Sequence, residues 1–182
     1  MKIYTISILL LFSFLLSFKA YSFQNSGEFF KIYPIGKVKK KGGSTFIKIL
    51  DKYSNALKGM DEFSHVIVVY WFNKNDTPEK RSILQVHPRG NKENPMTGVF
   101  ACRSPARPNL IALAVCKIIS VEKNVIYIDK IDAFDESPVI DLKPYIPRLD
   151  SHRKDIRLPQ WLDLSPYKWL DTGKQEIDAK RP

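Results

Sequence analysis

The sequence predicts an all-β-dominated protein: a small antiparallel β-barrel with one or two short helices and an irregular C-terminal extension. Three observations support this fold class. Short runs rich in β-branched and aromatic residues recur between turn signals. One run, residues 63–72, is apolar on both faces and is expected to be the central strand. Only residues 51–57 have the pattern of a short helix, which favours an antiparallel sheet or barrel.

Turn and loop residues separate the expected elements. Asp51 is expected to be the N-cap of a short helix that ends at Leu57 and is closed by Gly59. Residues 73–81 are polar and contain Pro78, which predicts a loop. The predicted strands are residues 30–39, 45–50, 63–72, 82–86, 110–121 and 125–131, with turns at Gly42-Gly43 and Glu122-Lys123-Asn124.

The composition indicates one globular domain with a strong positive charge. The chain has 182 residues, of which 44% are hydrophobic and 26% charged. Its net charge is +10, and the first 22 residues contribute two of these charges through Lys2 and Lys19, which leaves +8. A domain this basic favours anionic partners such as nucleic acid or a membrane surface, and charge alone does not choose between them.

Cysteine and histidine usage argues against a disulfide scaffold and against a metal centre. Cys102 and Cys116 are too few for a scaffold and are expected to be small buried residues, with one bridge between them as the alternative in an oxidising compartment. His65, His87 and His152 stand far apart and no Cys-x-x-Cys is present, so no metal site is predicted. We expect His65 to be a hydrogen-bonded core residue rather than a catalyst.

The N-terminus has the pattern of a targeting segment. Residues 1–22 combine a basic start, an apolar run over 3–18 and small residues before Phe23, which predicts a secretory signal and a secreted or periplasmic protein. The alternative is an uncleaved membrane anchor through residues 3–18, with the domain held in the cytoplasm by the lysines that follow. The predicted division is therefore 1–22 leader or anchor, 29–150 barrel domain and 151–182 C-terminal extension.

Two proline-stiffened loops carry opposite charges. Arg103 and Arg107 each lie within two residues of a proline, so the backbone is expected to be non-helical and to present both guanidinium groups in a fixed relation. Such groups suit a carboxylate or phosphate, although two solvated arginines on a surface loop would show the same spacing. Asp132, Asp135 and Glu136 could accept hydrogen bonds from a ribose or an amine, or the two loops could simply pair with each other.

Four motifs, taken together, resemble the TsaA-like family, whose characterised members are the TrmO-type tRNA methyltransferases. The resemblance covers roughly residues 33–150. The motifs are F-S-H-V-I-V-V-Y-W-F at 63–72, H-P-R-G-N at 87–91, G-V-F-A-C-R-S-P-A-R-P-N at 98–109 and S-P-V-I-D-L-K-P-Y-I-P at 137–147.

The resemblance implies a β-barrel that binds S-adenosyl-L-methionine, works as a homodimer and methylates N6 of threonylcarbamoyl-adenosine beside the tRNA anticodon. By motif, the cofactor-binding residues would be Arg103, Asn73, Lys74, Asp132, Asp135, Glu136, Ser137 and Pro138. Weaker matches, assigned to the substrate, are Arg107, Asn109 and Lys143. The chain departs from the family pattern in the short turn of residues 37–44, at Leu110-Ile111-Ala112, and at Cys102 and Glu136, which stand where the family commonly has Thr and Gly.

Two functions from different classes are compatible with the sequence. The first is an S-adenosyl-L-methionine-dependent methyltransferase acting on tRNA, which needs a cytoplasmic domain. The second is an exported, non-enzymatic protein of the cell envelope that binds S-adenosyl-L-methionine or another anionic small molecule. A methyltransferase anchored in the membrane with its domain in the cytoplasm is a variant of the first.

Overall fold

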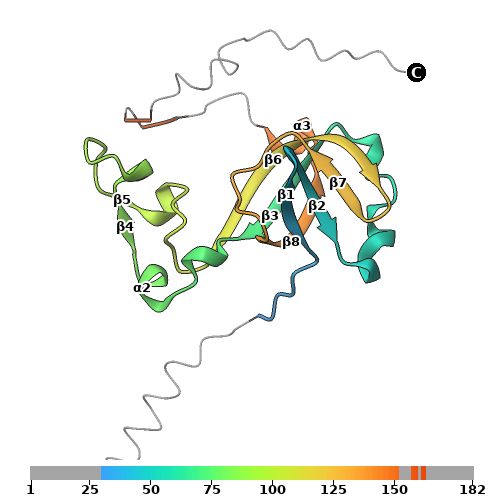
Figure 1. Ribbon diagram of the computed structural model, residues 1–182. Helices are drawn as coiled ribbons and strands as arrows, with labels where there is room; N and C mark the ends of the chain where they lie inside the picture. Colours follow the sequence, from blue (N-terminus) through green and yellow to red (C-terminus); the bar gives the residue numbers. More distant parts are fainter. Residues whose placement is uncertain (1–29, 152–156, 160, 163–182) are drawn as a thin grey trace, which may run out of the picture. The chain divides into compact units, whose positions relative to one another are not determined.

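The computed structural model describes residues 30–151, 157–159 and 161–162. It separates into two units, residues 1–33 and 34–182, and the fold lies in the second. Within the described residues, six antiparallel strands close into a barrel in the order β1-β2-β7-β6-β3-β8 (Figure 1), which confirms the predicted fold class. The strands are β1 (Gly36–Lys41), β2 (Ser44–Ile49), β3 (His65–Trp71), β6 (Ile111–Glu122), β7 (Val125–Ile128) and β8 (Pro138–Pro144).

The core fills the barrel interior with side chains that alternate along most strands, whereas β3 is buried at three consecutive residues, Val66–Val68. Successive side chains of a strand point to opposite faces, so every second residue faces inward. The strand predicted over residues 63–72 is present as β3, which pairs with both β6 and β8. Every strand of a closed barrel has two neighbours, so β3 is no more central than the others. Fully enclosed side chains come from each strand of the barrel and include Val38, Ile47, Val66, Val68, Cys116, Ile126 and Val139.

The first hairpin is shorter at its N-terminal side than predicted. The strand expected over residues 30–39 begins only at Gly36, and the return strand is at Ser44–Ile49. Gly36 permits a close approach between strands, because a Cβ there would lie 2.5 Å from the carbonyl oxygen of Lys48. Gly42 and Gly43 both have positive φ, as the predicted turn requires.

The predicted short helix exists, but its type and cap differ. Residues Asp51–Leu57 form a 3₁₀ helix, η1, whose N-cap is Leu50 without a side-chain hydrogen bond. The Asp51 carboxylate instead accepts a hydrogen bond of 2.7 Å from the Asn124 side chain in the β6–β7 turn. The Asp51 side-chain oxygen is thus bonded to Asn124, which is distant in sequence, and does not cap the helix. Gly59 closes this region with φ +82° and is followed by η2 (Met60–Glu62).

Between β3 and β6 lies a long connection whose secondary structure was predicted only in part. It leaves the barrel at Trp71 and returns at Ile111, and these two residues are paired. The predicted loop 73–81 contains helices, because Thr77 caps a turn that starts with Pro78. The predicted strand 82–86 shrinks to two residues. The elements are η3 (Asn73–Asn75), α2 (Pro78–Arg81), β4 (Gln85–Val86), η4 (Pro88–Gly90), β5 (Thr97–Gly98) and η5 (Val99–Ala101).

The ends of the chain are described only in part. The predicted leader at residues 1–22 lies outside the described residues, as does most of the predicted C-terminal extension after α3 (Pro147–Asp150). In the described ranges no helix is long and apolar enough to cross a membrane. Cys102 is partly buried, Cys116 is buried, and both are free thiols, so the alternative of a bridge between them is not realised.

Candidate functional site

Strand pairing brings the predicted site segments to one end of the barrel. The end of β3 pairs with the start of β6 through Trp71 and Ile111, and with the start of β8 through Tyr70 and Val139. In antiparallel sheets, the segments that follow one strand and precede its neighbours lie at the same edge. Residues 73–74, the end of the arginine loop (residues 98–110) and residues 132–138 of the acidic loop (residues 129–138) therefore meet at this end.

Direct contacts join the end of β3 to the acidic loop. The hydroxyl of Ser137, which is 1% exposed, donates a hydrogen bond of 3.3 Å to the side-chain oxygen of Asn73. The Tyr70 hydroxyl donates to the backbone carbonyl of Asp132, while the Asp132 side chain remains exposed. Burial, reinforced by the negative charge of Asp132, raises the pKa of Tyr70 to about 12, which keeps it a donor at neutral pH. Tyr70 was not predicted as a site residue.

Two carboxylates of the acidic loop, those of Glu136 and Asp135, contact lysine residues of β1 rather than the arginines. Lys37 donates to Glu136 at 2.9 Å and Lys39 pairs with the same carboxylate. The Lys39 contact, followed by that from Lys37, lowers the pKa of Glu136 to about 2. The Asp135 carboxylate accepts a hydrogen bond of 2.8 Å from the backbone N–H of Lys40. The alternative that the charges of the two loops pair with each other is therefore wrong for Glu136.

The two arginines of the predicted pair have different environments. The Arg107 guanidinium turns back into its own loop and donates to the carbonyls of Val99 and, at 2.8 Å, Cys102. Its Nε is buried without a partner among the described residues. Arg103 is exposed and makes no hydrogen bond or ion pair with any described residue. Arg107 thus braces the loop, and Arg103 is the one whose guanidinium is uncommitted within the part of the chain that the structure describes.

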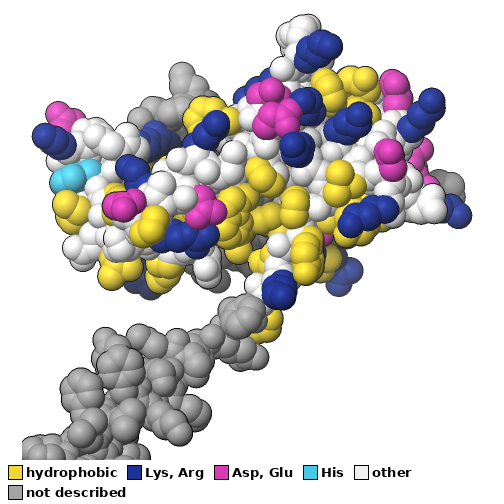
Figure 2. Space-filling model, turned by 60° about the horizontal axis from the view of Figure 1, so that its bottom comes forward, with side chains coloured by type: hydrophobic (Ala, Val, Ile, Leu, Met, Phe, Trp, Pro, Cys, Tyr) yellow, Lys and Arg dark blue, Asp and Glu magenta, His cyan; other side chains and the backbone are white. Residues whose placement is uncertain are grey.

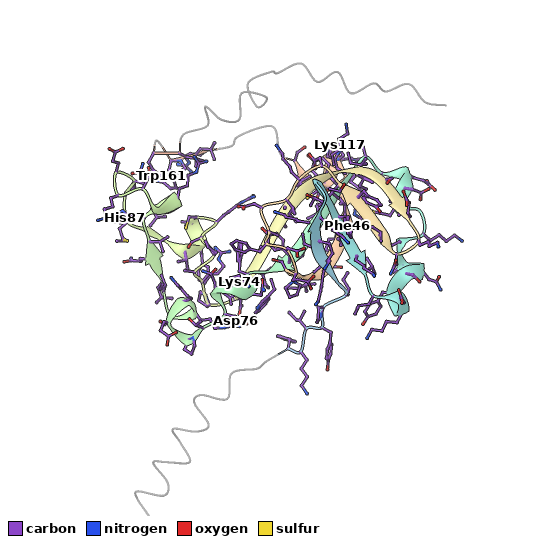
Figure 3. The ribbon with its side chains drawn as sticks, in the orientation of Figure 1. Phe46, Lys74, Asp76, His87, Lys117 and Trp161 are labelled. Carbon is purple, nitrogen blue, oxygen red and sulfur yellow. The ribbon has the colours of Figure 1, made fainter. Side chains whose placement is uncertain are left out.

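A cluster that sequence reasoning missed ties the arginine loop to β3. The Asp76 carboxylate, labelled in Figure 3, accepts hydrogen bonds from the Trp71 indole at 2.9 Å and from Arg81 Nε at 2.8 Å. Arg81 also lies over the Trp71 ring and donates to the Pro108 carbonyl at 2.9 Å. The contacts with Arg81 and Trp71 lower the pKa of Asp76. No local pattern signals this cluster, since its members lie up to 37 positions apart.

Of the remaining predicted residues, two lie at the candidate end of the barrel and one lies away from it. Lys74 and Asn109 are exposed at the candidate end. Lys143 lies five positions along β8 from Pro138, towards the opposite end, and forms a 2.7 Å ion pair with Asp141. His65 is hydrogen-bonded to Ser64 at 2.9 Å, as expected, but it is only half-buried rather than in the core.

The surface around these elements mixes basic and apolar side chains. Figure 2 shows hydrophobic side chains across the middle of the view, with lysine and arginine side chains on both sides and acidic side chains interspersed among them. Among the residues described, no group of three His, Cys, Asp or Glu side chains converges as metal ligands would.

Comparison with known proteins assigns the chain to a family. Residues 30–151 match the family described as the tRNA-methyltransferase O N-terminal domain. A protein of Methanocaldococcus jannaschii, named a probable S-adenosyl-L-methionine-binding protein, is 49% identical over 117 residues, which are 64% of this chain and 93% of that protein. The human tRNA (adenine(37)-N6)-methyltransferase is 40% identical over 104 residues, or 57% of this chain and 23% of that enzyme.

Solved structures agree with this assignment. TrmO from Pseudomonas aeruginosa superposes with a TM-score of 0.55 at 26% identity, covering 71% of this chain and 61% of that one. The match thus spans less than two thirds of the solved enzyme. Since the family match extends over most of the chain and coincides with the barrel, this protein belongs to the family of the tRNA-methyltransferase O N-terminal domain.

Proposed function

We propose that this protein binds S-adenosyl-L-methionine at the candidate end of the barrel and transfers its methyl group to an adenine base of tRNA. The observation that carries the proposal is the convergence of residues 73–74, the end of the arginine loop and residues 132–138 at one barrel end, within a chain of this family. Relatives named for S-adenosyl-L-methionine binding and for adenine-37 methylation of tRNA support it.

The donor set suits this cofactor. Arg103, uncommitted and exposed on a braced loop, would hold the carboxylate of the methionine part. The exposed Asp132 carboxylate would accept from ribose hydroxyls. Ser137 and Asn73 already hold each other in place and line the same end. Glu136 is occupied by Lys37 and Lys39, so its role is to position β1 against the loop rather than to bind.

Methyl transfer requires alignment more than proton chemistry. When bound, S-adenosyl-L-methionine supplies an electrophilic methyl group on a sulfonium. The barrel end contributes by fixing where donor and acceptor meet, and such positioning accounts for a large part of a barrier. Loops held by Arg107, by Arg81 and by the Tyr70 hydroxyl are suited to that task.

The test measures binding and methylation separately. Calorimetry with S-adenosyl-L-methionine should show binding by the full chain and its loss in Arg103→Ala, whereas Lys117→Ala, an exposed lysine on β6, should bind normally. Mass spectrometry should detect methylated adenosine in tRNA after incubation with the cofactor. Absence of binding at millimolar cofactor would contradict the proposal.

A second candidate is a binding protein without enzymatic activity in the cell envelope. It is favoured by the name of the 49% identical archaeal relative, which mentions binding only. It also agrees with the predicted secretory leader at residues 1–22. This candidate predicts cofactor binding that depends on Arg103 together with no methylation of any RNA. Methylation of tRNA by the wild-type chain would exclude it.

A further inference from the structure

The outer face of β1, β2 and β7 carries lysines and aromatic rings in matched rows. Lys39 is paired with Phe46, and Phe46 with Tyr127, across the three strands. Lys37 is paired with Lys48 in the neighbouring row. The side chains between these positions are buried in the barrel, so the five residues share the outer face. We call them the lysine–aromatic face.

The aromatic pair lies open at the middle of this face. The rings of Phe46 and Tyr127 are 5.4 Å apart at a tilt of 45°, and both side chains are partly exposed (Figure 3 labels Phe46). Neighbouring rings on the outside of a sheet give a nucleic-acid base a surface on which to stack. Base stacking is tolerant of sequence, so this surface would not by itself select a base.

The lysines lie beside Phe46 on β1 and β2 and leave an excess of positive charge. Lys37 is 56% exposed and Lys39 34%, and these two share the single carboxylate of Glu136. Lys48 is exposed and makes no ion pair with a described residue. Adjacent strands are about 4.8 Å apart and alternate residues about 7 Å apart, so the charges lie within one or two nucleotides' length of the rings.

The outer face of β6 has a different composition. The outer side of β6 presents Ile111, Leu113, Val115 and Ile119, with Lys117 as its only charged residue between them. That face lacks the repeated positive charges that a phosphate backbone requires. Rings flanked by lysines therefore occur on the β1-β2-β7 side.

We propose that the lysine–aromatic face binds single-stranded RNA, with Phe46 and Tyr127 stacking on bases and Lys37, Lys39 and Lys48 contacting phosphates. The inference rests on the proposed function, because it assigns the surface by which an RNA substrate would reach the barrel. An anionic membrane is the rival partner. It is less suited, because the two rings are partly buried side by side rather than projecting as an apolar anchor would.

Fluorescence anisotropy with a labelled, unstructured RNA 17-mer and the full chain tests the proposal without added cofactor. We expect Phe46→Leu to weaken binding about tenfold, because one stacking contact is removed. Phe46→Tyr, which keeps an aromatic ring, should bind RNA as wild type does. Lys48→Ala should lower the slope of log affinity against log salt by about 0.7. Phe63→Leu and Lys117→Ala, an exposed aromatic and an exposed lysine outside the face, should bind as wild type.

Several outcomes would overturn the inference. Unchanged RNA affinity in a folded Phe46→Leu or Tyr127→Leu chain would do so, with folding checked by thermal melts. So would binding to phosphatidylserine vesicles that depends on Phe46 while RNA binding does not. Calorimetry with S-adenosyl-L-methionine separates the two proposals. If RNA binding depends on Phe46 but the chain does not bind the cofactor, the RNA-binding role of the lysine–aromatic face is supported and the proposed enzyme is contradicted.

Discussion

Arg103 and Arg107 show how one sequence pattern can hold two roles. Four positions separate them, yet Arg107 donates to carbonyls of its own loop while Arg103 remains exposed. Both residues carry the same charge, and each lies within two residues of a proline. The difference arises because the η5 turn (Val99–Ala101) presents its carbonyls to Arg107.

We predict that replacing these arginines separates stability from binding. Arg107→Ala should lower the free energy of unfolding by about 2 kcal/mol, since hydrogen bonds to a charged donor are lost. Arg103→Ala should leave it unchanged and abolish cofactor binding. Urea unfolding and calorimetry measure the two effects. Equal stability loss in both variants would contradict the division of roles.

Glu136 occupies a backbone conformation that favours glycine, with φ +66°. Glu136→Gly and Glu136→Ala both delete the carboxylate, so they differ in the backbone strain at this position, which exceeds the larger entropy loss of glycine on folding. We expect the glycine variant to melt about 3–5 °C higher than the alanine variant. Differential scanning calorimetry checks this order, and the reverse order would mean that the loop rearranges.

The Glu136 ion pairs should also give a defined pH dependence. The pKa of Glu136 falls from its ordinary 4.5 to about 2, so the pairs stabilise the folded state above about pH 5 and are lost as the pH falls towards 2. The melting temperatures of wild type and Glu136→Gln should therefore differ by a small constant amount at neutral pH and converge near pH 2. The difference stays small because the pairs are exposed. A gap that persists at pH 2 would assign the effect to packing.

At the scale of elements, α2 and the segment before it act as a clamp on the arginine loop. Arg81→Ala removes the contacts with Asp76, Pro108 and Trp71. We expect faster hydrogen exchange over residues 98–110 and cofactor affinity reduced about two- to tenfold, because the loop must then be ordered on binding. Lys80→Ala, in the same helix and exposed, is the matched control. Faster exchange without weaker binding would limit the clamp to a structural role.

At the scale of the whole molecule, the location of the domain decides which function it can perform. The predicted leader stays a prediction. Alkaline phosphatase fused after Asp51 should be active if the chain is exported and inactive if residues 3–18 anchor a cytoplasmic domain. Strong phosphatase activity would favour the binding protein over the tRNA methyltransferase, because tRNA is cytoplasmic.

The sequence by itself determined the class of fold, the strands β2, β3, β6 and β7 and the turn glycines. These features follow from alternation and φ preferences within a few residues. The segments of the candidate site were also recognisable, because their motifs are local. Only the tertiary structure decided which charges meet: Glu136 with β1 lysines, Asp76 with Arg81 and Trp71, and Arg107 with its own loop. Such partners depend on strand register and barrel closure, and no local pattern contains them.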